Sequence, residues 1–329
     1  MTQHEYFLGI DGGGSKTEAI LADSNGNIIG MGTSGPSNSN LVSIEEALNS
    51  VRDAYFGAVI RIDEGIRLSG VSICIPGFTH NVERIELAHL FRVELNQMNI
   101  YADHKSAYAG ALLNQPGVIV LSGTGSFSYG KDHYDKEIIM GGWGPLIGDE
   151  GSGYYIGRMA LTAITKSFEG RGSYTLLSSK ILDYWGLKQT HELRNYLYSK
   201  GNYQQVISSL APIVYKCANK QDQISIWIIN KAAVHLAKLA YQTIKQLNFN
   251  DNEVAVALTG GLSNFGRLIK SPFKNYLTKE CGNRIQVKEP MFSPAIGSVI
   301  ISLIDGKKEI TQDLIKNLKT SFEFYRRIN

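Results

Sequence analysis

The strongest constraint on this chain is an internal repeat of a strand followed by a glycine turn. Residues 6–15 (YFLGIDGGGS) and 117–126 (GVIVLSGTGS) both run from apolar residues through one polar residue into closely spaced glycines and a hydroxyl. Aligning Ser15 with Ser126 gives a shift of about 111 residues, which is close to the length of one domain. The same shift places residues 28–30 on residues 139–141, at the end of a second short strand. The repeat predicts a duplicated α/β domain.

The first glycine turn is similar to a phosphate-binding P-loop, but its context differs. Ser15 displaces Lys16 by one position from the P-loop pattern, and a P-loop leads directly into a helix. Here a second apolar run follows Thr17, and Asn25-Gly26 separates it from a third, which is a strong hairpin signal. The glycines are therefore predicted to connect two antiparallel strands. A dinucleotide-binding turn is also excluded, because the third glycine of its pattern is missing.

Apolar periodicity and turn residues predict the remaining elements. Helices are expected at residues 43–55, with Ser43 as N-cap, and at 82–95, 105–113, 295–304 and 311–325; strands are expected at 71–75, 100–102, 254–258 and 284–287. Residues 153–246 are mostly helical in pattern. We therefore predict an N-terminal domain over residues 1–116, onto which a C-terminal helix of about 309–329 docks, and a second domain over 117–308 with a helical insertion.

Composition excludes several classes of function. The 329 residues balance 33 Lys and Arg against 30 Asp and Glu, so the net charge of +3 provides no basic field for nucleic acid. The longest apolar runs are about a third of the roughly 20 residues that a membrane helix needs, and no signal-peptide pattern opens the sequence. Three separated cysteines and seven scattered histidines predict neither a disulfide framework nor a zinc site. We expect a cytoplasmic protein with a small-molecule ligand and no nucleic-acid or membrane partner.

The two glycine turns are candidate phosphate sites, because glycine permits close backbone approach and successive amides can form an anion-binding nest. Hydroxyls and one charge would add donors; these belong to Ser15, Lys16, Thr17, Thr124 and Ser126. The alternative is two plain hairpins, which the matching register of the turns disfavours. Asp11 closes the first strand and could hold Mg²⁺ through water, or could stabilise the turn as an Asx-type residue.

Asp103 is a candidate general base, because an Asp that follows a strand of an α/β sheet points into the ligand crevice. The alternative is that it caps the next helix. Residues 141–153 hold six glycines around Trp143, and Asp149 and Glu150 could complete a wall for a sugar. The alternative there is a structural loop in which Asp149 caps the following helix.

Two further loops leave alternatives open. Gly260-Gly261 would let adenine or ribose lie flat against the backbone, or would serve only as strand–helix turn chemistry. Residues 34–40 form a polar loop whose Asn38 and Asn40 could bind a ligand, and an ordinary loop is the competing interpretation.

Four segments together resemble the N-acetylglucosamine kinase branch of the BadF/BadG/BcrA/BcrD ATPase family, within the actin/Hsp70/sugar-kinase superfamily. They are residues 9–17 (GIDGGGSKT), 121–126 (LSGTGS), 142–152 (GWGPLIGDEGS) and 258–261 (LTGG). The resemblance covers residues 6 to about 300, and it implies duplicated ribonuclease H-like (actin-like ATPase) domains with an interdomain cleft. It further implies an ATP-dependent kinase that phosphorylates the 6-hydroxyl of N-acetylglucosamine or a related amino sugar, uses ATP and Mg²⁺, and forms a homodimer.

The resemblance also implies a role for each motif residue. Asp103 would deprotonate the sugar 6-hydroxyl, and Asp11 would lie beside Mg²⁺. The nucleotide positions are Gly12, Gly13, Gly14, Ser15, Lys16 and Thr17 in the first phosphate motif, Gly123, Thr124 and Gly125 in the second, and Gly260 and Gly261 at adenosine. The sugar positions are Asn38, Asp103, Ser126, Gly142, Trp143, Gly144 and Asp149. His104 departs from the small residue that commonly follows the catalytic Asp, and a different loop length leaves Asn38 or Asn40 open.

Three alternatives to an N-acetylglucosamine kinase remain. One is an N-acetylmuramate or glucosamine kinase of the same family. Another is an ATPase activator of a radical dehydratase, which holds an iron–sulfur cluster and is disfavoured because Cys74, Cys217 and Cys281 lie in unrelated contexts. The last is a non-catalytic sugar sensor, against which the presence of both Asp11 and Asp103 argues.

Overall fold

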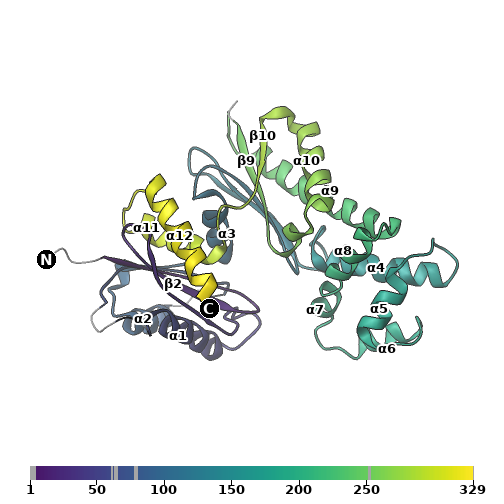
Figure 1. The fold of residues 1–329 in the computed structure, drawn as a ribbon, viewed down its shortest axis with the longest axis horizontal. Helices are drawn as coiled ribbons and strands as arrows, with labels where there is room; N and C mark the ends of the chain where they lie inside the picture. Colours follow the sequence, from purple (N-terminus) through teal and green to yellow (C-terminus); the bar gives the residue numbers. More distant parts are fainter. Residues whose placement is uncertain (1–4, 61, 63–65, 78–80, 251–252, 329) are drawn as a thin grey trace. The chain divides into compact units, whose positions relative to one another are not determined.

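The chain folds into two compact α/β units. A computed structural model describes residues 5–328 except 61, 63–65, 78–80 and 251–252. Unit 1 comprises residues 1–115 and 290–329, and unit 2 comprises residues 116–289. Both ends of the chain therefore belong to unit 1, and Figure 1 shows the C-terminal helices in yellow beside the purple N-terminal strands.

Unit 1 is built on a five-stranded mixed sheet in the order β3-β2-β1-β4-β5. The strands are β1 (Tyr6–Gly12), β2 (Thr17–Asp23), β3 (Ile28–Ser34), β4 (Leu68–Cys74) and β5 (Met98–Tyr101). β1, β2 and β3 pair antiparallel, whereas β4 is parallel to both β1 and β5. The first glycine turn joins β1 to β2, with Gly12 opposite Thr17, and Gly26 takes a φ of 84° in the next hairpin. Both predicted hairpins are confirmed.

Among the described residues of unit 1, five helices accompany this sheet. They are α1 (Ile44–Val59), α2 (Asn81–Phe91), α3 (Asp103–Leu112), α11 (Pro294–Asp305) and α12 (Gln312–Ile328), and a short 3₁₀ turn, η1 (Leu95–Gln97), precedes β5. Ser43 caps α1 as predicted, because its hydroxyl accepts the Glu46 N–H at 3.1 Å. α12 lies along β3, where the Ser321 hydroxyl accepts the Ile28 N–H at 3.0 Å.

The position of α11 differs from the predicted domain boundary at residue 308. This helix packs against β1 and α3, so the chain returns to unit 1 at Pro290. Its apolar side chains join a buried cluster with side chains of the N-terminal segment; the cluster includes Phe7, Ile20, Cys74, Ala109, Ile296, Val299, Ile300 and Leu303. The apolar pattern of residues 295–304 predicted the helix correctly, but a pattern does not identify which sheet the helix covers.

Close backbone contacts place α11. A Cβ added to Gly297 would lie 1.9 Å from the Ser106 carbonyl oxygen on α3, and one added to Gly9 would lie 2.2 Å from the Val299 nitrogen. Glycine at these positions lets α11 approach α3 on one side and β1 on the other. One helix therefore holds together the two elements that carry Asp11 and Asp103.

Unit 2 repeats the sheet of unit 1. Its strands are β6 (Gly117–Ser122), β7 (Ser126–Lys131), β8 (Glu137–Gly141), β9 (Val254–Thr259) and β10 (Ile285–Lys288), in the order β10-β9-β6-β7-β8. β6, β7 and β8 pair antiparallel, and β9 is parallel to both β6 and β10. Matching β6 to β1 reproduces the order and directions of the first sheet, which confirms the predicted duplication.

The register of the repeat differs from the predicted alignment. Gly12 pairs with Thr17 across the first turn, and Ser122 pairs with Ser126 across the second. Thr17 is therefore the counterpart of Ser126, and the alignment of Ser15 with Ser126 is wrong. The alignment of residues 28–30 with 139–141 is also wrong, because Ile28 begins β3 whereas Gly141 ends β8. Strand pairing sets the register, and the two turns differ in length by one residue.

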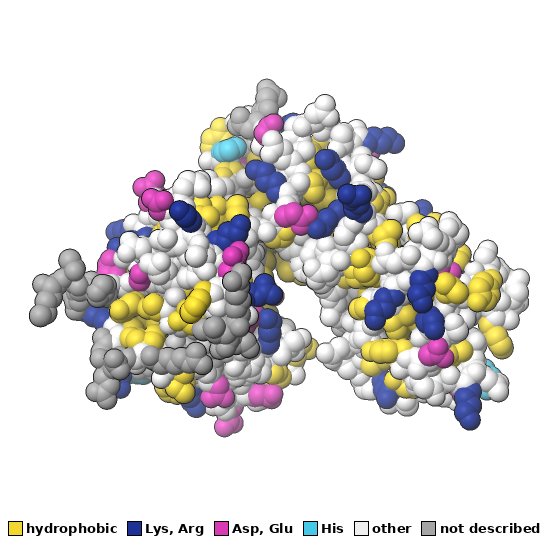
Figure 2. All heavy atoms as spheres, in the orientation of Figure 1, with side chains coloured by type: hydrophobic (Ala, Val, Ile, Leu, Met, Phe, Trp, Pro, Cys, Tyr) yellow, Lys and Arg dark blue, Asp and Glu magenta, His cyan; other side chains and the backbone are white. Residues whose placement is uncertain are grey.

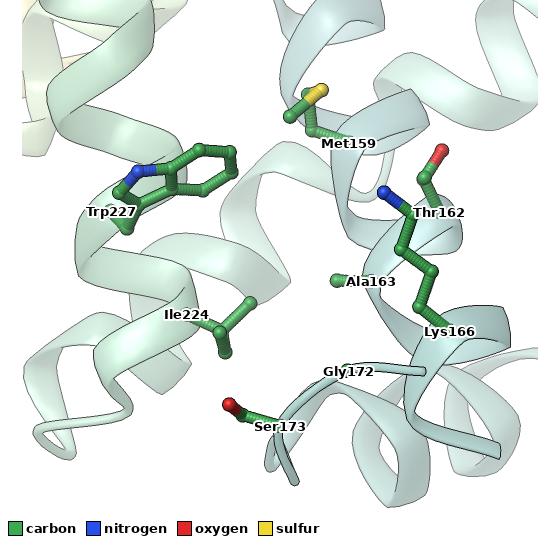
Figure 3. Close-up of a pocket in the computed structure, with 8 residues that line it drawn as sticks. All are labelled: Met159, Thr162, Ala163, Lys166, Gly172, Ser173, Ile224 and Trp227. Atoms are coloured by element: carbon green, nitrogen blue, oxygen red, sulfur yellow. The ribbon is translucent and has the colours of Figure 1, made fainter. Parts of the chain in front are cut away.

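In the part of residues 142–253 that the structure describes, six helices form the predicted helical insertion. They are α4 (Gly153–Phe168), α5 (Leu177–Trp185), α6 (Glu192–Tyr198), α7 (Tyr203–Ser208), α8 (Ala211–Asn219) and α9 (Gln223–Gln246). The 3₁₀ turn η2 (Gly261–Phe265), α10 (Arg267–Cys281) and η3 (Gly282–Arg284) then connect β9 to β10. A cavity of about 380 Å³ lies between α4 and α9, beside Met159, Lys166 and Trp227 (Figure 3). None of the predicted site residues lines it.

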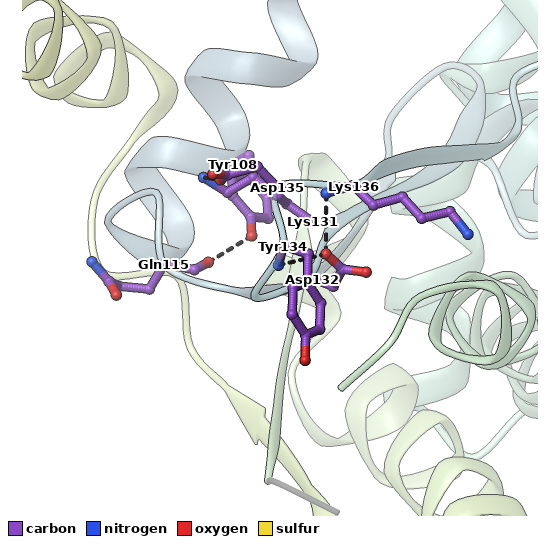
Figure 4. Close-up of polar contacts among 7 residues, drawn as sticks. All are labelled: Tyr108, Gln115, Lys131, Asp132, Tyr134, Asp135 and Lys136. Atoms are coloured by element: carbon purple, nitrogen blue, oxygen red, sulfur yellow. Dashed lines mark hydrogen bonds and ion pairs between the residues drawn. The ribbon is translucent and has the colours of Figure 1, made fainter. Parts of the chain in front are cut away.

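Buried polar anchors fix the ends of two elements. In unit 2 the Asp132 carboxylate accepts the backbone N–H groups of Tyr134 and Lys136 at 2.9 and 3.0 Å (Figure 4). It also accepts the Asn248 N–H at 3.0 Å, which ties the β7–β8 hairpin to the segment that follows α9. These bonds lower the pKa of Asp132. In unit 1 the Tyr108 hydroxyl donates to the Gln115 carbonyl at 2.5 Å beyond the end of α3.

The visible surface carries mixed charge. On the face shown in Figure 2, Lys and Arg side chains are interspersed with acidic and apolar ones in both units. Among the described helices, none combines the length and the apolar character that a membrane span requires.

The glycine contacts of α11 generate the first prediction. Gly297→Ala should lower the free energy of unfolding by at least about 2 kcal/mol, because the new methyl meets α3 backbone that cannot move away. Helix propensity alone would favour alanine by about 1 kcal/mol, so any decrease in the free energy of unfolding is due to the steric clash. Urea denaturation measures it. Gly201→Ala is the control and should stay within about 0.5 kcal/mol, because nothing lies within 4 Å of its added Cβ.

Candidate functional site

The first glycine turn is an exposed loop that is hydrogen-bonded to residues 37–38. The Gly13 N–H donates to the Lys16 carbonyl at 3.1 Å, and the Gly13 carbonyl accepts the N–H groups of Ser37 and Asn38. Gly14, Ser15 and Lys16 are exposed, and Lys16 pairs with Glu18 at 2.5 Å. Gly12 has no room for a side chain, since an added Cβ would lie 2.0 Å from the Ser37 hydroxyl. The turn therefore exposes backbone and the Lys16 ammonium group to solvent, and residues 37–38 pack beneath it and fix its position.

Thr17 and Asn38 use their side chains within this loop. The buried Thr17 hydroxyl donates to the Gly35 carbonyl at 2.8 Å, and the Asn38 side-chain oxygen accepts the Asn40 N–H at 3.0 Å. Thr17 thus binds the loop of residues 34–40 to the glycine turn, and its hydroxyl is already engaged. Asn38 is partly buried and keeps its amide group as a possible donor, whereas Asn40 is exposed.

Asp11 and Asp103 meet through a serine that the sequence analysis did not single out. The Ser106 hydroxyl lies 2.5 Å from Asp11 Oδ1 and 2.6 Å from the Asp103 carbonyl oxygen. Asp11 pairs with Cys74 across β1 and β4, and burial raises the pKa of the Cys74 thiol. Ser106 is fully buried. The available signal was its position three residues after Asp103, on the same face of the helix.

Asp103 does not cap α3. The N-cap residue is Ala102, with no side-chain bond, and Asp103 is the first helical residue. Its carboxylate is partly buried and contacts the N–H groups of His104 and of Asp103 itself. Burial raises the pKa of Asp103, and these N–H groups lower it in part. A carboxylate whose pKa is raised is better suited to accept a proton near neutral pH.

Asp11 carries the more strongly perturbed carboxyl group. Burial raises its pKa to about 7, and Glu18 and Asp103 add to the shift, while the Ser106 hydrogen bond and Lys16 oppose it. A divalent cation beside this carboxylate would offset the cost of its ionisation, and carboxylate oxygen is a ligand that Mg²⁺ prefers. No group of three or more His, Cys, Asp or Glu side chains able to hold a metal occurs among the described residues. The site thus fits a cation bound by one carboxylate together with water or substrate oxygens.

In unit 2 the second glycine turn is bound to the start of α4. Gly123 and Thr124 accept through their carbonyls the N–H groups of Gly153 and Tyr154, at 2.8 and 3.2 Å. Thr124 is exposed at the tip. The first amides of α4 are thereby used by the protein itself, and the Gly123 N–H donates to the Gly125 carbonyl at 2.9 Å. The turn can therefore offer a ligand the amides of Thr124 and Gly125 and the Thr124 hydroxyl.

The glycine-rich loop closes over the same turn. The Ser126 hydroxyl donates to the Glu150 carbonyl at 2.9 Å, and its N–H donates to Asp149 Oδ1 at 3.2 Å. Ser126 thus repeats the role of Thr17, because each hydroxyl at the first residue of a second strand binds the backbone of a neighbouring loop. Both residues are buried.

Asp149 is not the cap of α4. Ser152 is the N-cap and accepts the Tyr155 N–H at 3.1 Å, whereas Asp149 turns back toward Ser126 with a φ of 61°. The Asp149 side chain is buried, and burial raises its pKa. A carboxylate that accepts backbone N–H groups still has lone pairs that can accept from a ligand hydroxyl.

Trp143 is the exposed part of this loop. It is 73% exposed, and Gly142 and Gly144 on either side take positive φ values of 75° and 82°. Leu146 and Ile147 are exposed beside it. The loop thus presents an aromatic face next to backbone that only glycine adopts easily.

Gly260 and Gly261 end β9. Gly260 has a φ of 85°, and an added Cβ would lie 2.5 Å from the Ser122 carbonyl, so this glycine is required where β9 meets β6. Gly261 is exposed, and an added Cβ would have no neighbour within 4 Å. Of the two glycines, Gly261 is therefore the one with open space beside it.

The three cysteines are not grouped into one site. Cys74 and Cys217 are buried in different units, and Cys281 is partly exposed.

Comparison with known proteins gives a family match and full-length relatives. A model of the BadF/BadG/BcrA/BcrD ATPase family matches residues 8–302. The N-acetylmuramic acid/N-acetylglucosamine kinase of Clostridium acetobutylicum is 30% identical over 301 residues, which are 91% of this chain and 98% of that protein. The N-acetyl-D-glucosamine kinase of Dictyostelium discoideum is 29% identical over 324 residues, which are 92% and 99% of the two chains.

Solved structures agree on the fold. A proposed N-acetylglucosamine kinase from Chromobacterium violaceum matches with a TM-score of 0.67 and 24% identity, covering 91% of this chain and 98% of the other. A ROK family glucokinase from Streptomyces griseus matches with a TM-score of 0.56 and 15% identity, covering 92% and 100%. The duplicated sugar-kinase fold is thereby confirmed.

The raised pKa of Asp11 generates a prediction on stability. Its pKa is about 7 in the folded protein against an ordinary 3.8, so the folded state keeps a proton that the unfolded state has lost between these values. The free energy of unfolding therefore falls as pH rises from about 4 to about 7. Asp11→Asn removes this cost and should stabilise the protein by about 2 kcal/mol at pH 8 without divalent cations, and by less at pH 5. Urea denaturation at both pH values measures this.

Asp132→Asn is the matched control, since the pKa of that buried carboxyl is lowered by backbone N–H groups. This variant should be less stable than the wild type at pH 8. An Asp11→Asn protein that is also less stable at pH 8 would show that ionised Asp11 is well accommodated, contrary to its burial.

Proposed function

Because this chain belongs to the BadF/BadG/BcrA/BcrD ATPase family, we propose that it is an ATP-dependent kinase that phosphorylates an amino sugar. The observation that carries the proposal is the pairing of Asp11 and Asp103 through Ser106, beside an exposed glycine turn. Phosphoryl transfer depends mainly on positioning and electrostatic stabilisation, so a base, a cation ligand and phosphate-binding loops are sufficient parts.

The glycine turn of each unit is a proposed nucleotide-binding element. Gly13, Gly14, Ser15 and Lys16 would contact phosphate oxygens from unit 1, and Gly123, Thr124 and Gly125 would do so from unit 2. Gly261 would lie against adenosine. We assign Gly12, Thr17 and Gly260 to the shape of these loops, because Gly12 and Gly260 have no room for a side chain and the Thr17 hydroxyl is engaged.

Asp103 would act as the general base. The sugar hydroxyl oxygen attacks the γ-phosphorus, its O–H proton passes to the Asp103 carboxylate, and the bond to the β–γ bridging oxygen breaks to release ADP. Mg²⁺, when bound beside Asp11, supplies neutralisation of the phosphate charge. Burial of Asp103 supports this assignment, because it raises the pKa of a carboxylate that must take up a proton.

The sugar would be held by the glycine-rich loop and by the Asn-containing loop. Asp149 would accept sugar hydroxyl groups, Trp143 would cover an apolar face of the ring, and Gly142 and Gly144 would present backbone. Asn38 would donate through its amide group. Ser126 contributes its position, because its hydroxyl and N–H are already bonded to Glu150 and Asp149.

The finer assignment is transfer to the 6-hydroxyl of N-acetylglucosamine. Similarity to kinases whose names include N-acetylglucosamine and N-acetylmuramic acid supports the class of sugar. We also expect a cytoplasmic location, and a homodimer, which the family resemblance implies.

A coupled assay of ADP release over a panel of sugars tests the function. The panel contains N-acetylglucosamine, N-acetylmuramate, glucosamine and N-acetylmannosamine, with glucose as the control. We expect ADP release that depends on an N-acetylated amino sugar and on Mg²⁺, and phosphorus NMR of the product should place the phosphate on the 6-oxygen. Equal and sugar-independent ADP release across the panel would contradict the proposal.

The role of Asp103 has its own test. Asp103→Asn should lower kcat by roughly 10²-fold or more while ATP affinity stays nearly unchanged, because the amide cannot accept the proton. Asp53→Asn is the control, since Asp53 is exposed on α1, and it should leave kcat unchanged. Near-normal turnover of Asp103→Asn would remove Asp103 from the mechanism.

A further inference from the structure

Ser106 occupies the point where three elements of unit 1 meet. It lies on α3, and its hydroxyl reaches Asp11 at the end of β1, the residue that pairs with Cys74 at the end of β4. Its own carbonyl is the atom closest to the Cβ that Gly297 lacks. Packing on both sides therefore leaves this buried hydroxyl little freedom to choose other partners.

The hydroxyl has a single proton for two short contacts. Asp11 Oδ1 and the Asp103 carbonyl oxygen lie 2.5 and 2.6 Å away, and a carbonyl or an ionised carboxylate can only accept. The proton can thus serve one of them at a time. A separation of 2.5 Å is typical of an O–H group that donates to a charged carboxylate, and such bonds are stronger than those to neutral acceptors.

A second serine shows what the same geometry looks like without a carboxylate. Ser298 on α11 is also fully buried, and its hydroxyl donates to the Ala295 carbonyl three residues earlier at 2.7 Å. This is ordinary back-bonding within a helix. Ser106 and Ser298 both contact the carbonyl of the residue three positions earlier, but only the Ser106 hydroxyl also contacts a carboxylate, that of Asp11.

We propose that Ser106 is a positioning residue: its hydroxyl donates to Asp11, holds that carboxylate in the orientation that receives the divalent cation accompanying the nucleotide, and couples it to the turn of α3 that carries Asp103. The inference rests on the proposed function for the identity of the nucleotide. Groups that bond to a metal-binding carboxylate orient it, and removing them typically weakens metal binding 10- to 100-fold. The contact of Ser106 with Asp11 meets this description.

The test measures cation affinity without catalysis. Mn²⁺ replaces Mg²⁺ as the probe and is titrated by electron paramagnetic resonance into the full-length protein with a non-hydrolysable ATP analogue and no sugar. Ser106→Ala should raise the Mn²⁺ dissociation constant by about 10-fold. Ser298→Ala should leave it within twofold of the wild type, although both variants lose a buried helical hydroxyl. Asp11→Asn sets the maximum loss.

Each outcome decides the proposal. A Ser106→Ala protein within twofold of the wild type overturns it, and so does an equal loss in Ser298→Ala, which would indicate general loosening of the fold. Should Ser106→Ala fail to fold, Ser106→Cys carries the test, because a thiol fills the same space and donates weakly. Its affinity should fall by a few-fold, and unchanged affinity overturns the proposal. Absence of sugar-dependent ADP release would contradict the proposed kinase activity, but the Mn²⁺ affinities would still test the role of Ser106, because they are measured without sugar or turnover.

Discussion

The close approach of α11 to β1 and α3 is the contact on which the arrangement of unit 1 depends. Gly9 and Gly297 remove the side chains that would keep these backbones apart. Asp11 and Asp103 lie about 90 residues apart in the chain, yet both contact the hydroxyl of Ser106. Their separation is therefore determined by backbone packing against a third element. Such packing is stiff, because protein interiors are close-packed and do not deform continuously.

The two units use one structural device for different purposes. Thr17 and Ser126 begin equivalent strands, and each donates its hydroxyl to the backbone of a neighbouring loop. In unit 1 the loop that is bound contains Asn38, and in unit 2 it contains Trp143 and Asp149. The duplicated turn thus provides the backbone that we propose binds phosphate, and it also fixes the position of a second loop. Divergence between the units lies in what those loops carry.

Much of the fold followed from local patterns, because hairpin residues and apolar periodicity act over short distances. The antiparallel pair around the first glycine turn and the Ser43 cap were both predicted correctly. The alignment of Ser15 with Ser126 failed because glycines indicate that a turn is present but do not determine how many residues it contains. Ser106 escaped notice because a serine within a helical pattern gives no sign of burial; only the tertiary contact with Asp11 reveals it. The bond from the Ser126 N–H to the Asp149 carboxylate was hidden for the same reason.

The discontinuity of unit 1 has a consequence for biosynthesis. Translation delivers β1 and α3 early, but α11 leaves the ribosome only after the whole of unit 2 has been made. Until then the apolar surface of Phe7, Ile20 and Ala109 lacks its covering helix, and such surface is prone to aggregation or to capture by chaperones. A nascent chain stopped before residue 294 would hold every proposed catalytic side chain and still lack the helix that sets their spacing. The spacing of Asp11 and Asp103 can therefore form only after α11 has been synthesised.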